Sequence, residues 1–349
     1  MTSTSDSVVI IGAGQSGLAG AFAVRAAGMH PVLLEAGHRT VGSWPDYYDS
    51  LTLFSPARFS GFPGAPFPGD PDRYPSRDEV VAYLEKLALD LDAEIHLNTR
   101  ATAVEASGDG FVVHTDSGQE FRSTRVISAS GSFTNPFVPP IPGRFSGQLL
   151  HVADYRSPKQ YAGQRVVVVG AGNSAIQVGY ELAEVATVTL AVRRPVQFVP
   201  QVRGGRDMHY WLHTLRLDLL PPSVLRRLFR STLVFDTGIY SNALTSGLLD
   251  QRPMFTAFED DEVVWTDGSH EHVDTVIFAT GYRPNLPYLK HLGALDSTGM
   301  PLHQRGISRT HQGLGYVGIE FQRSFSSNTL RGVSRDAQYV VRALSIARK

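Results

Sequence analysis

Two glycine-rich turns constrain the fold of this chain more than any other feature of its sequence. The first, Gly12-Ala-Gly-Gln-Ser-Gly17, follows a short apolar run, and the second, Gly170-Ala-Gly-Asn-Ser-Ala175, follows another. In the pattern G-x-G-x-x-G the first glycine permits a tight turn and the second lets the backbone approach a pyrophosphate. The third, where alanine is tolerated, lets the helix pack closely on the strand. Each turn therefore predicts a strand, a helix and a second strand around a dinucleotide.

The residue that ends the second strand differs between the two units. In the first unit it is Glu35, whose carboxylate can accept hydrogen bonds from ribose hydroxyls. In the second unit Arg193 and Arg194 follow the strand, and an arginine suits a ribose that carries a 2′-phosphate. The sequence thus predicts FAD at the first turn and NADPH at the second.

The repeat of this unit predicts the domain organisation. We expect an α/β fold with two Rossmann-like dinucleotide-binding domains, the NADPH domain inserted into the FAD domain. Residues 1–157 and 281–349 are expected to form the FAD-binding domain, and residues 158–280 the NADPH-binding domain. Helix-like segments over 208–219 and 223–229 are expected to decorate the inserted domain.

Three segments outside the two units carry local signals. Ser76 followed by Glu79 is a capping-box pattern that predicts the start of a helix with an apolar face through residue 91. Residues 334–347 are expected to form a closing helix. Residues 41–75 are rich in Gly, Pro and aromatic side chains without a clear period, and a loop of that length in a compact domain is usually functional.

Composition excludes several classes of function. The chain has 349 residues, a formal net charge of -1 and no cysteine. The absence of cysteine excludes thiolate metal sites, cysteine nucleophiles and the redox-active pair of disulfide reductases. Without a run of like charges we expect no nucleic-acid partner, and no apolar stretch approaches the ~20 residues of a membrane span. The polar N-terminus does not resemble a signal peptide, so the expected location is cytoplasmic.

A motif between the two units adds a resemblance to a known family. Phe145-Ser-Gly-Gln-Leu-Leu-His151-Val-Ala-Asp-Tyr155 fits the pattern F-x-G-x-x-x-H-x-x-x-Y just before the second turn. The chain therefore resembles the flavin-containing monooxygenases with two dinucleotide-binding domains (class B), and the likeness extends over nearly its whole length. Gly42-Ser-Trp44 and Tyr74–Val80 are more similar to the compact bacterial branch, which includes monooxygenases of arsenic operons and flavoproteins assigned to potassium or metal transport.

The resemblance implies a reaction and a set of cofactor contacts. NADPH would reduce FAD, and the reduced flavin would react with O2 to a C(4a)-(hydro)peroxide. One oxygen atom would then pass to a small soft nucleophile (S, N or As), or the peroxide would attack a carbonyl. The residues expected to contact the cofactors are Gly12, Gly14, Gln15, Ser16, Gly17, Glu35, Ala36, Ser43, Trp44, Ser55, Val104, Ser130, Gly131, Gly170, Gly172, Asn173, Ser174, Arg193, Arg194, Ala279, Thr280 and Gly281.

The chemistry itself belongs to the cofactors, so we expect no obligatory acid–base pair and assign no catalytic residue. His151 and Tyr155 could transfer protons, but a positional role for them is at least as plausible. His209 and His213 are spaced as metal ligands on one helix face, yet no third ligand stands at a matching spacing, and packing is the favoured interpretation.

Two alternatives stay open: a reductase or oxidase of the same architecture that inserts no oxygen, and a flavoprotein sensor that regulates a transport partner. One departure bears on them. Several family members place an asparagine beside the flavin where this chain has Phe54-Ser55. The expected partners are a small-molecule substrate and O2. The oligomeric state is open, with a homodimer as one alternative.

Overall fold

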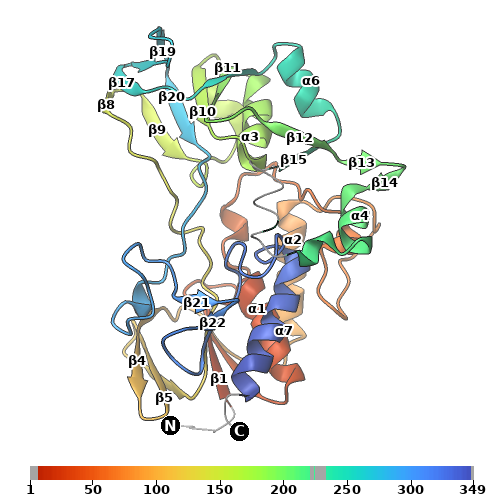
Figure 1. Ribbon diagram of the computed structural model, residues 1–349, viewed down its shortest axis with the longest axis vertical. Helices are drawn as coiled ribbons and strands as arrows, with labels where there is room; N and C mark the ends of the chain where they lie inside the picture. Colours follow the sequence, from red (N-terminus) through yellow and green to blue (C-terminus); the bar gives the residue numbers. More distant parts are fainter. Residues whose placement is uncertain (1–6, 221–223, 225–232, 347–349) are drawn as a thin grey trace.

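The computed structural model describes residues 7–220, 224 and 233–346, which fold into two halves, each built on a sheet whose central strands run parallel. Figure 1 shows the halves one above the other, joined on one side by two extended segments. The predicted helix over 223–229 lies almost wholly outside the described residues. In the described ranges, no helix combines the length and the apolar character needed to cross a membrane.

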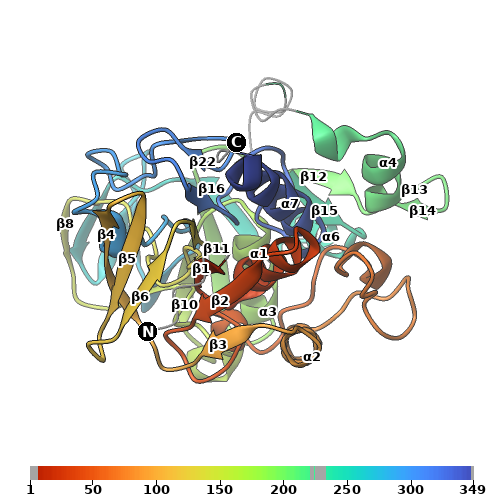
Figure 2. The ribbon, with the colours of Figure 1, turned by 90° about the horizontal axis from the view of Figure 1, so that it is seen from below.

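The first half is centred on a seven-stranded sheet of order β21-β22-β23-β7-β1-β2-β3. Its strands are β1 (Ser7–Ile11), β2 (His30–Leu34), β3 (Glu94–His96), β7 (Val126–Ser128), β21 (His303–Gln304), β22 (Ile307–Ser308) and β23 (Leu314–Tyr316). Three helices cover one face: α1 (Gln15–Ala26), α2 (Arg77–Leu89) and α7 (Leu330–Ile346). The antiparallel strands β4 (Ala101–Ser107), β5 (Gly110–Thr115) and β6 (Glu120–Ser123) lie on the other side, with the short helix η5 (Pro287–Leu289) (Figure 2).

Alternation along β1 shows why its sequence is apolar throughout. Val8 and Ile10 pack with the helices, whereas Val9 and Ile11 pack with β4, β5 and η5. A parallel strand that is covered on both faces has no solvent side, so every position is apolar. β1 pairs in parallel with β2 and β7, as the crossover through α1 requires.

The second half repeats this plan around a five-stranded sheet of order β16-β11-β10-β20-β9. Its strands are β9 (Gln148–His151), β10 (Arg165–Val169), β11 (Thr187–Val192), β16 (Asp250–Pro253) and β20 (Thr275–Phe278). The helix α3 (Asn173–Ala183) and the short helix η3 (Pro158–Tyr161) lie on the Val166 side, while Val167 and Val169 face a second layer. That layer is the sheet of β8 (Gly143–Phe145), β17 (Ala257–Asp260), β18 (Glu262–Val264) and β19 (His270–His272).

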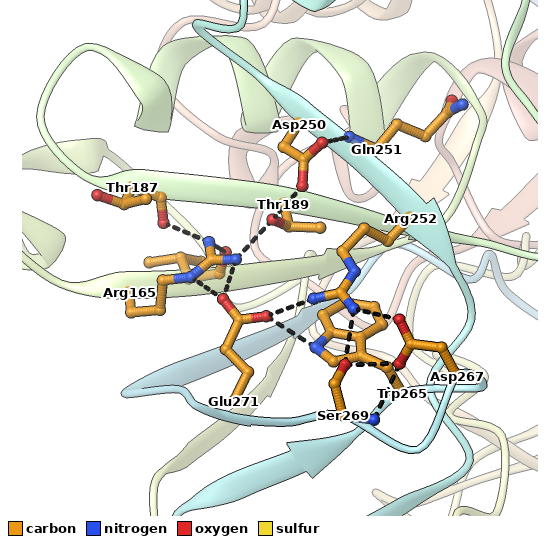
Figure 3. A network of polar contacts seen from close by, with 11 residues as sticks. Arg165, Thr187, Thr189, Asp250, Gln251, Arg252, Trp265, Asp267, Ser269 and Glu271 are labelled. Carbon is orange, nitrogen blue, oxygen red and sulfur yellow. Dashed lines mark hydrogen bonds and ion pairs between the residues drawn. The ribbon is translucent and has the colours of Figure 1, made fainter.

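A polar network ties these two layers at their edge (Figure 3). Glu271 of β19 accepts from Arg165 of β10 and from Arg252 of β16, and the Arg252 guanidinium lies 4.1 Å from the centre of the Trp265 ring. Trp265 Nε1 donates to the same carboxylate at 2.7 Å. Because each charged group in this half-buried cluster has an opposite charge or a hydrogen-bond partner, its role is structural.

The pairing of strands β8 and β9 bears on the predicted division of the chain. Both lie inside residues 1–157, yet β8 pairs with β17 and β9 pairs with β20, both strands of the second half. The motif 145–155 is therefore held by the second sheet rather than by a connecting loop. We propose that the chain crosses into the NADPH-binding domain before Gly143, and that it returns after β20, near residue 281.

Segments that decorate the halves meet beside α3. The loop over residues 41–75 has no regular strand and contains two single turns, η1 (Trp44–Asp46) and η2 (Ala57–Phe59). From the second half come β12 (Gln197–Pro200), β13 (Val202–Arg203), β14 (Arg206–Asp207), α4 (Met208–Thr214), η4 (Leu217–Leu219), β15 (Leu233–Asp236) and α6 (Ile239–Thr245). The hairpin of β13 and β14 projects from the edge of the molecule in Figure 1.

The local predictions are confirmed within a few residues. Ser76 accepts from the Glu79 N–H while the Glu79 carboxylate accepts from the Ser76 N–H, so the capping box at the start of α2 is complete. Both helices after the glycine turns begin inside the turns, at Gln15 and Asn173. The reason is that the polar residues of each turn already form the first helical turn.

Candidate functional site

The first glycine turn has the close contacts that its pattern requires. Gly12 has φ +100°, and a Cβ atom there would lie 2.8 Å from the Ala129 carbonyl oxygen. A Cβ atom on Gly17 would lie 1.8 Å from the Gly12 carbonyl oxygen. The first position therefore needs a conformation that glycine adopts freely, and the third admits no side chain.

The helix N-termini in both glycine turns are left open for phosphate. In the described chain α1 and α3 have neither a side-chain cap nor an acidic residue in the first turn, whereas α2 has a full capping box. Free N–H groups and the positive end of the helix dipole then point out of each glycine turn. Gly14 and Gly172 are the N-cap residues, so no side chain covers these donors. Both turns fit the pyrophosphate of a dinucleotide.

Glu35 comes directly after β2 and reaches back to the first turn. Its Oε2 accepts from the Ala13 N–H at 2.7 Å, and its Oε1 accepts from the Gly37 N–H at 2.8 Å. These two bonds fix the carboxylate beside the turn and occupy one acceptor position on each oxygen. Since an ionised carboxylate offers about four lone-pair positions, the others can accept from ribose hydroxyls. Ala36 follows in the same half-buried bend.

Of the flavin contacts predicted in the long loop, one pair touches the start of α1, and the third residue bonds within the loop. Trp44 Nε1 donates to Oε1 of Gln15 at 3.1 Å, which places the Ser43–Trp44 pair at the start of α1. Ser55 instead directs its hydroxyl to the hydroxyl of Ser60 at 2.9 Å, within the loop.

The remaining residues predicted for the FAD side divide into two groups. Ser130 and Gly131 follow β7, and the Cα atom of Ser130 lies against Gly12, so they adjoin the turn. The Ser130 hydroxyl lies 2.9 Å from that of Tyr288. Ser16 lies in the first turn of α1. Val104, by contrast, has its fully buried side chain in the core behind β1, so only its backbone is left to meet a ligand.

The backbone that follows β20 packs against the second turn. Gly170 has φ +146°, and a Cβ atom there would lie 2.5 Å from the Ala279 carbonyl oxygen. Asn173 and Ser174 begin α3 and are half-buried. Arg193 and Arg194 are exposed directly after β11, at the same end of the sheet as the turn. The structure thus brings the predicted NADPH residues to one sheet edge.

The histidine of the motif holds the chain where it returns to the first half. Nδ1 of His151 accepts from the Ala153 N–H at 3.1 Å, and Nε2 lies 3.1 Å from the Gly281 carbonyl oxygen, to which it donates. Burial lowers the pKa of His151, so the ring is neutral and both nitrogens are engaged. The neighbouring Thr280 hydroxyl donates to the Phe137 carbonyl. These contacts favour the positional role for His151.

Tyr155, the last residue of the motif, is also engaged. Its buried hydroxyl donates to Oε2 of Glu181 on α3 at 3.1 Å, and its ring stacks on that of Tyr161. Burial and the Glu181 carboxylate raise the pKa of Tyr155, so the hydroxyl stays protonated. Through Tyr155 the motif contacts α3, and through His151 it contacts Gly281, where the chain returns to the first half.

The neutral state of His151 predicts a pH dependence of stability. The pKa of His151 in the folded protein is below the unfolded value of about 6.5. The neutral ring therefore contributes its full stabilisation above about pH 6.5, and this stabilisation is lost as the pH falls from there through the folded pKa. We expect His151→Gln, which keeps one donor and one acceptor, to reduce the loss of thermal stability between about pH 8 and about pH 5. Burial also lowers the pKa of His303, so part of the loss should remain.

Thermal melts of wild type and His151→Gln across this pH range test the prediction. The exposed His38 supplies the control, His38→Gln, which should keep the wild-type profile. An unchanged slope in His151→Gln would show that the protonation of this ring is not linked to folding.

The paired histidines of α4 lie in an aromatic cluster. Nδ1 of His209 lies 2.8 Å from Oδ1 of Asp207, and its ring packs with Phe54 and Phe235. His213 packs with Phe59. Phe54, at the position where several family members have asparagine, thus packs on side chains of the second half. In the described ranges, no three potential metal ligands come together.

Two further glycines, Gly42 and Gly318, adjoin the first turn although the sequence did not predict a cofactor contact for either. Gly42 has φ +56° and its Cβ atom would lie 3.0 Å from the Cα atom of Gly14; Gly318 has φ +90° and its Cβ atom would lie 2.1 Å from the Ser16 hydroxyl oxygen. Both let distant segments approach the first turn. Gly42 could have been found beside Ser43–Trp44, but nothing near Gly318 forms a recognisable pattern.

Two uncapped glycine turns, each following a parallel strand, are typical of an oxidoreductase that binds two dinucleotides. A family model described as pyridine nucleotide-disulphide oxidoreductase matches residues 9–318. The chain belongs to this family, among its flavin monooxygenases.

Three similar proteins support this placement. An uncharacterized oxidoreductase CzcO-like of Geobacillus kaustophilus is 32% identical over 340 residues, covering 96% of this chain and 97% of the relative. Indole-3-pyruvate monooxygenase YUCCA1 of Oryza sativa subsp. japonica is 32% identical over 380 residues, covering 96% and 90%. The structure of a flavin-containing monooxygenase from Stenotrophomonas maltophilia has a TM-score of 0.85 at 30% identity, covering 98% and 99%. The family resemblance and the fold class predicted from the sequence are confirmed.

Proposed function

We propose that this protein is an FAD- and NADPH-dependent monooxygenase that transfers one oxygen atom from O2 to a small soft nucleophile (S, N or As). The observation that carries the proposal is the pair of open helix N-termini, each in a glycine turn that a Cβ atom would obstruct. Two dinucleotides in one chain allow a hydride from one to reach the other. Bound FAD would supply the hydride acceptor and the reaction with O2.

The residues of the chain would bind and orient the two cofactors. Gly12, Gly14 and Gly17 would bring backbone N–H groups to the FAD pyrophosphate, with Glu35 on the ribose. Gly170 and Gly172 would do the same for NADPH, with Arg193 and Arg194 on the 2′-phosphate.

A second candidate substrate is a 2-oxo acid. The rice relative is named indole-3-pyruvate monooxygenase, and its similarity covers 96% of this chain. The aromatic side chains around Phe54 suit an aryl substrate as well as they suit packing. A panel that contains a thioether, a tertiary amine, arsenite and indole-3-pyruvate separates the two classes by product.

Rapid mixing tests the proposed reaction. We expect NADPH to bleach the flavin without oxygen, and mixing with O2 to give a transient distinct from the reduced and the oxidised flavin. NADPH consumption should then match oxygenated product. Stoichiometric hydrogen peroxide, with no transient and no product from any member of the panel, would favour an oxidase. Reduction of a quinone or carrier in preference to O2 would favour the reductase.

A further inference from the structure

One short segment of the long loop contacts both glycine turns. Residues 42–50, Gly-Ser-Trp-Pro-Asp-Tyr-Tyr-Asp-Ser, lead from the start of α1 to side chains of α3. The two turns are 158 positions apart in the chain (170 − 12), so few short segments can reach both. We call residues 42–50 the bridging segment.

At its first end the bridging segment lies directly on the FAD turn. The backbones of Gly42 and Gly14 are so close that a Cβ atom on Gly42 would lie 3.0 Å from the Gly14 Cα atom. Two residues later, the Trp44 indole donates to Oε1 of Gln15, the first residue of α1. Movement of residues 42–44 therefore changes the surroundings of the phosphate-binding N–H groups of α1.

At its other end the bridging segment contacts side chains along α3. The Tyr48 hydroxyl, on a side chain that is 2% exposed, donates to Oε1 of Gln177 at 2.5 Å and interacts with the Ser174 side chain. The Ser50 hydroxyl donates to Oε2 of Glu181 at 2.8 Å. Ser174 is one of the residues proposed to bind NADPH, and Glu181 also accepts from Tyr155 of the motif.

Between its ends the segment is held in one conformation by several hydrogen bonds. The Asp46 N–H donates to the Ser43 carbonyl in a single tight turn around Pro45. The Tyr47 carbonyl accepts from the Arg77 guanidinium at 2.8 Å, and the Asp49 N–H donates to the Arg156 carbonyl at 2.9 Å. Burial raises the pKa of Tyr48, so its hydroxyl remains a donor throughout the physiological range.

From these contacts we propose that the bridging segment couples the two nucleotide sites, with Tyr48 as a positioning residue for the NADPH site. The inference rests on the proposed function, because it requires both nucleotides to bind. When the N-terminal turn of α3 closes on NADPH, Tyr48 is held in place, and the segment holds Trp44 and Gly42 against the FAD turn. Coupling of this kind is reciprocal: NADP⁺ tightens FAD binding by the same factor by which FAD tightens NADP⁺ binding.

The test measures that factor directly. The FAD dissociation constant of the purified holoprotein is determined by equilibrium dialysis with and without saturating NADP⁺. We expect NADP⁺ to tighten FAD binding in wild type by roughly 5- to 150-fold. Tyr48→Phe, which removes the hydroxyl alone, should reduce the factor to within about twofold of one, while FAD affinity without NADP⁺ changes little.

A matched control and a second variant keep the test decisive. Tyr161 is equally buried in the same cluster, but its hydroxyl bonds to Gln160, so Tyr161→Phe should keep the wild-type factor. Gln177→Ala removes the acceptor from the helix side and should mimic Tyr48→Phe even if that variant folds poorly. A wild-type factor of one, or a full factor in both Tyr48→Phe and Gln177→Ala, overturns the coupling but leaves the proposed function standing. Failure of wild type to bind FAD or NADP⁺ overturns both.

Discussion

Gly17→Ala should yield a protein that purifies without flavin. The new Cβ atom would lie 1.8 Å from the Gly12 carbonyl oxygen, a backbone atom that cannot turn aside as the end of a side chain can. The start of α1 would have to move away from β1, and its N–H groups would then no longer converge on the pyrophosphate. We expect FAD affinity to fall on the order of a hundredfold, which corresponds to about 2.7 kcal/mol.

Gly20→Ala is the matched control in the same helix. A Cβ atom there would lie 3.7 Å from the nearest atom, Cδ1 of Ile10, which is an ordinary contact. Alanine is also favoured over glycine inside a helix by about 1 kcal/mol. The control should therefore keep its flavin and melt at the same temperature or higher. Flavin absorbance per protein and thermal melts of both variants provide the measurement, and flavin retained by Gly17→Ala at wild-type affinity would contradict the assigned turn.

The sequence predicts best what depends on neighbouring residues. The strands of the two units, the helices between them and the capping box at Ser76 follow from periodicity and turn chemistry, which act over a few positions. The family motif could also be recognised, because its four fixed residues are close in sequence.

What the sequence does not predict depends on pairing between distant segments. Nothing local indicates that β8 and β9 join the second sheet, because the strands they pair with, β17 and β20, lie more than a hundred positions later. Gly318 is required by the Ser16 hydroxyl, which only the folded chain brings near. Tyr48 and Gln177 likewise meet through tertiary packing, with no spacing rule between them.

Val104, in β4, shows a related limit. A period of two predicts which residues share a face of a strand, but not which face meets a ligand. The structure places the Val104 side chain in the core, among residues that include Val9 and Val113. Its predicted contact with the cofactor is thus restricted to the backbone, and the contact itself stays a prediction.

Removing the two arginines after β11 should reverse the preference between the nicotinamide cofactors. Arg193 and Arg194 are exposed directly beyond Val192, at the sheet edge that carries the second turn. A charge-assisted hydrogen bond to a 2′-phosphate is worth about 1.5–3 kcal/mol, so its loss should weaken NADPH roughly 10- to 150-fold. NADH has no such phosphate, and its binding should change less than about threefold, within ~0.7 kcal/mol.

The measurement is kcat/KM for NADPH and for NADH in wild type, Arg193→Ala, Arg194→Ala and the double variant. Arg144→Ala removes an equally exposed arginine from β8 and controls for the general loss of positive charge. Because a phosphate contact is screened by ions, the wild-type preference for NADPH should also shrink as salt is raised, and that of the double variant should not. An equal loss for both cofactors in the double variant would place the 2′-phosphate elsewhere and remove the reason for assigning NADPH to this turn.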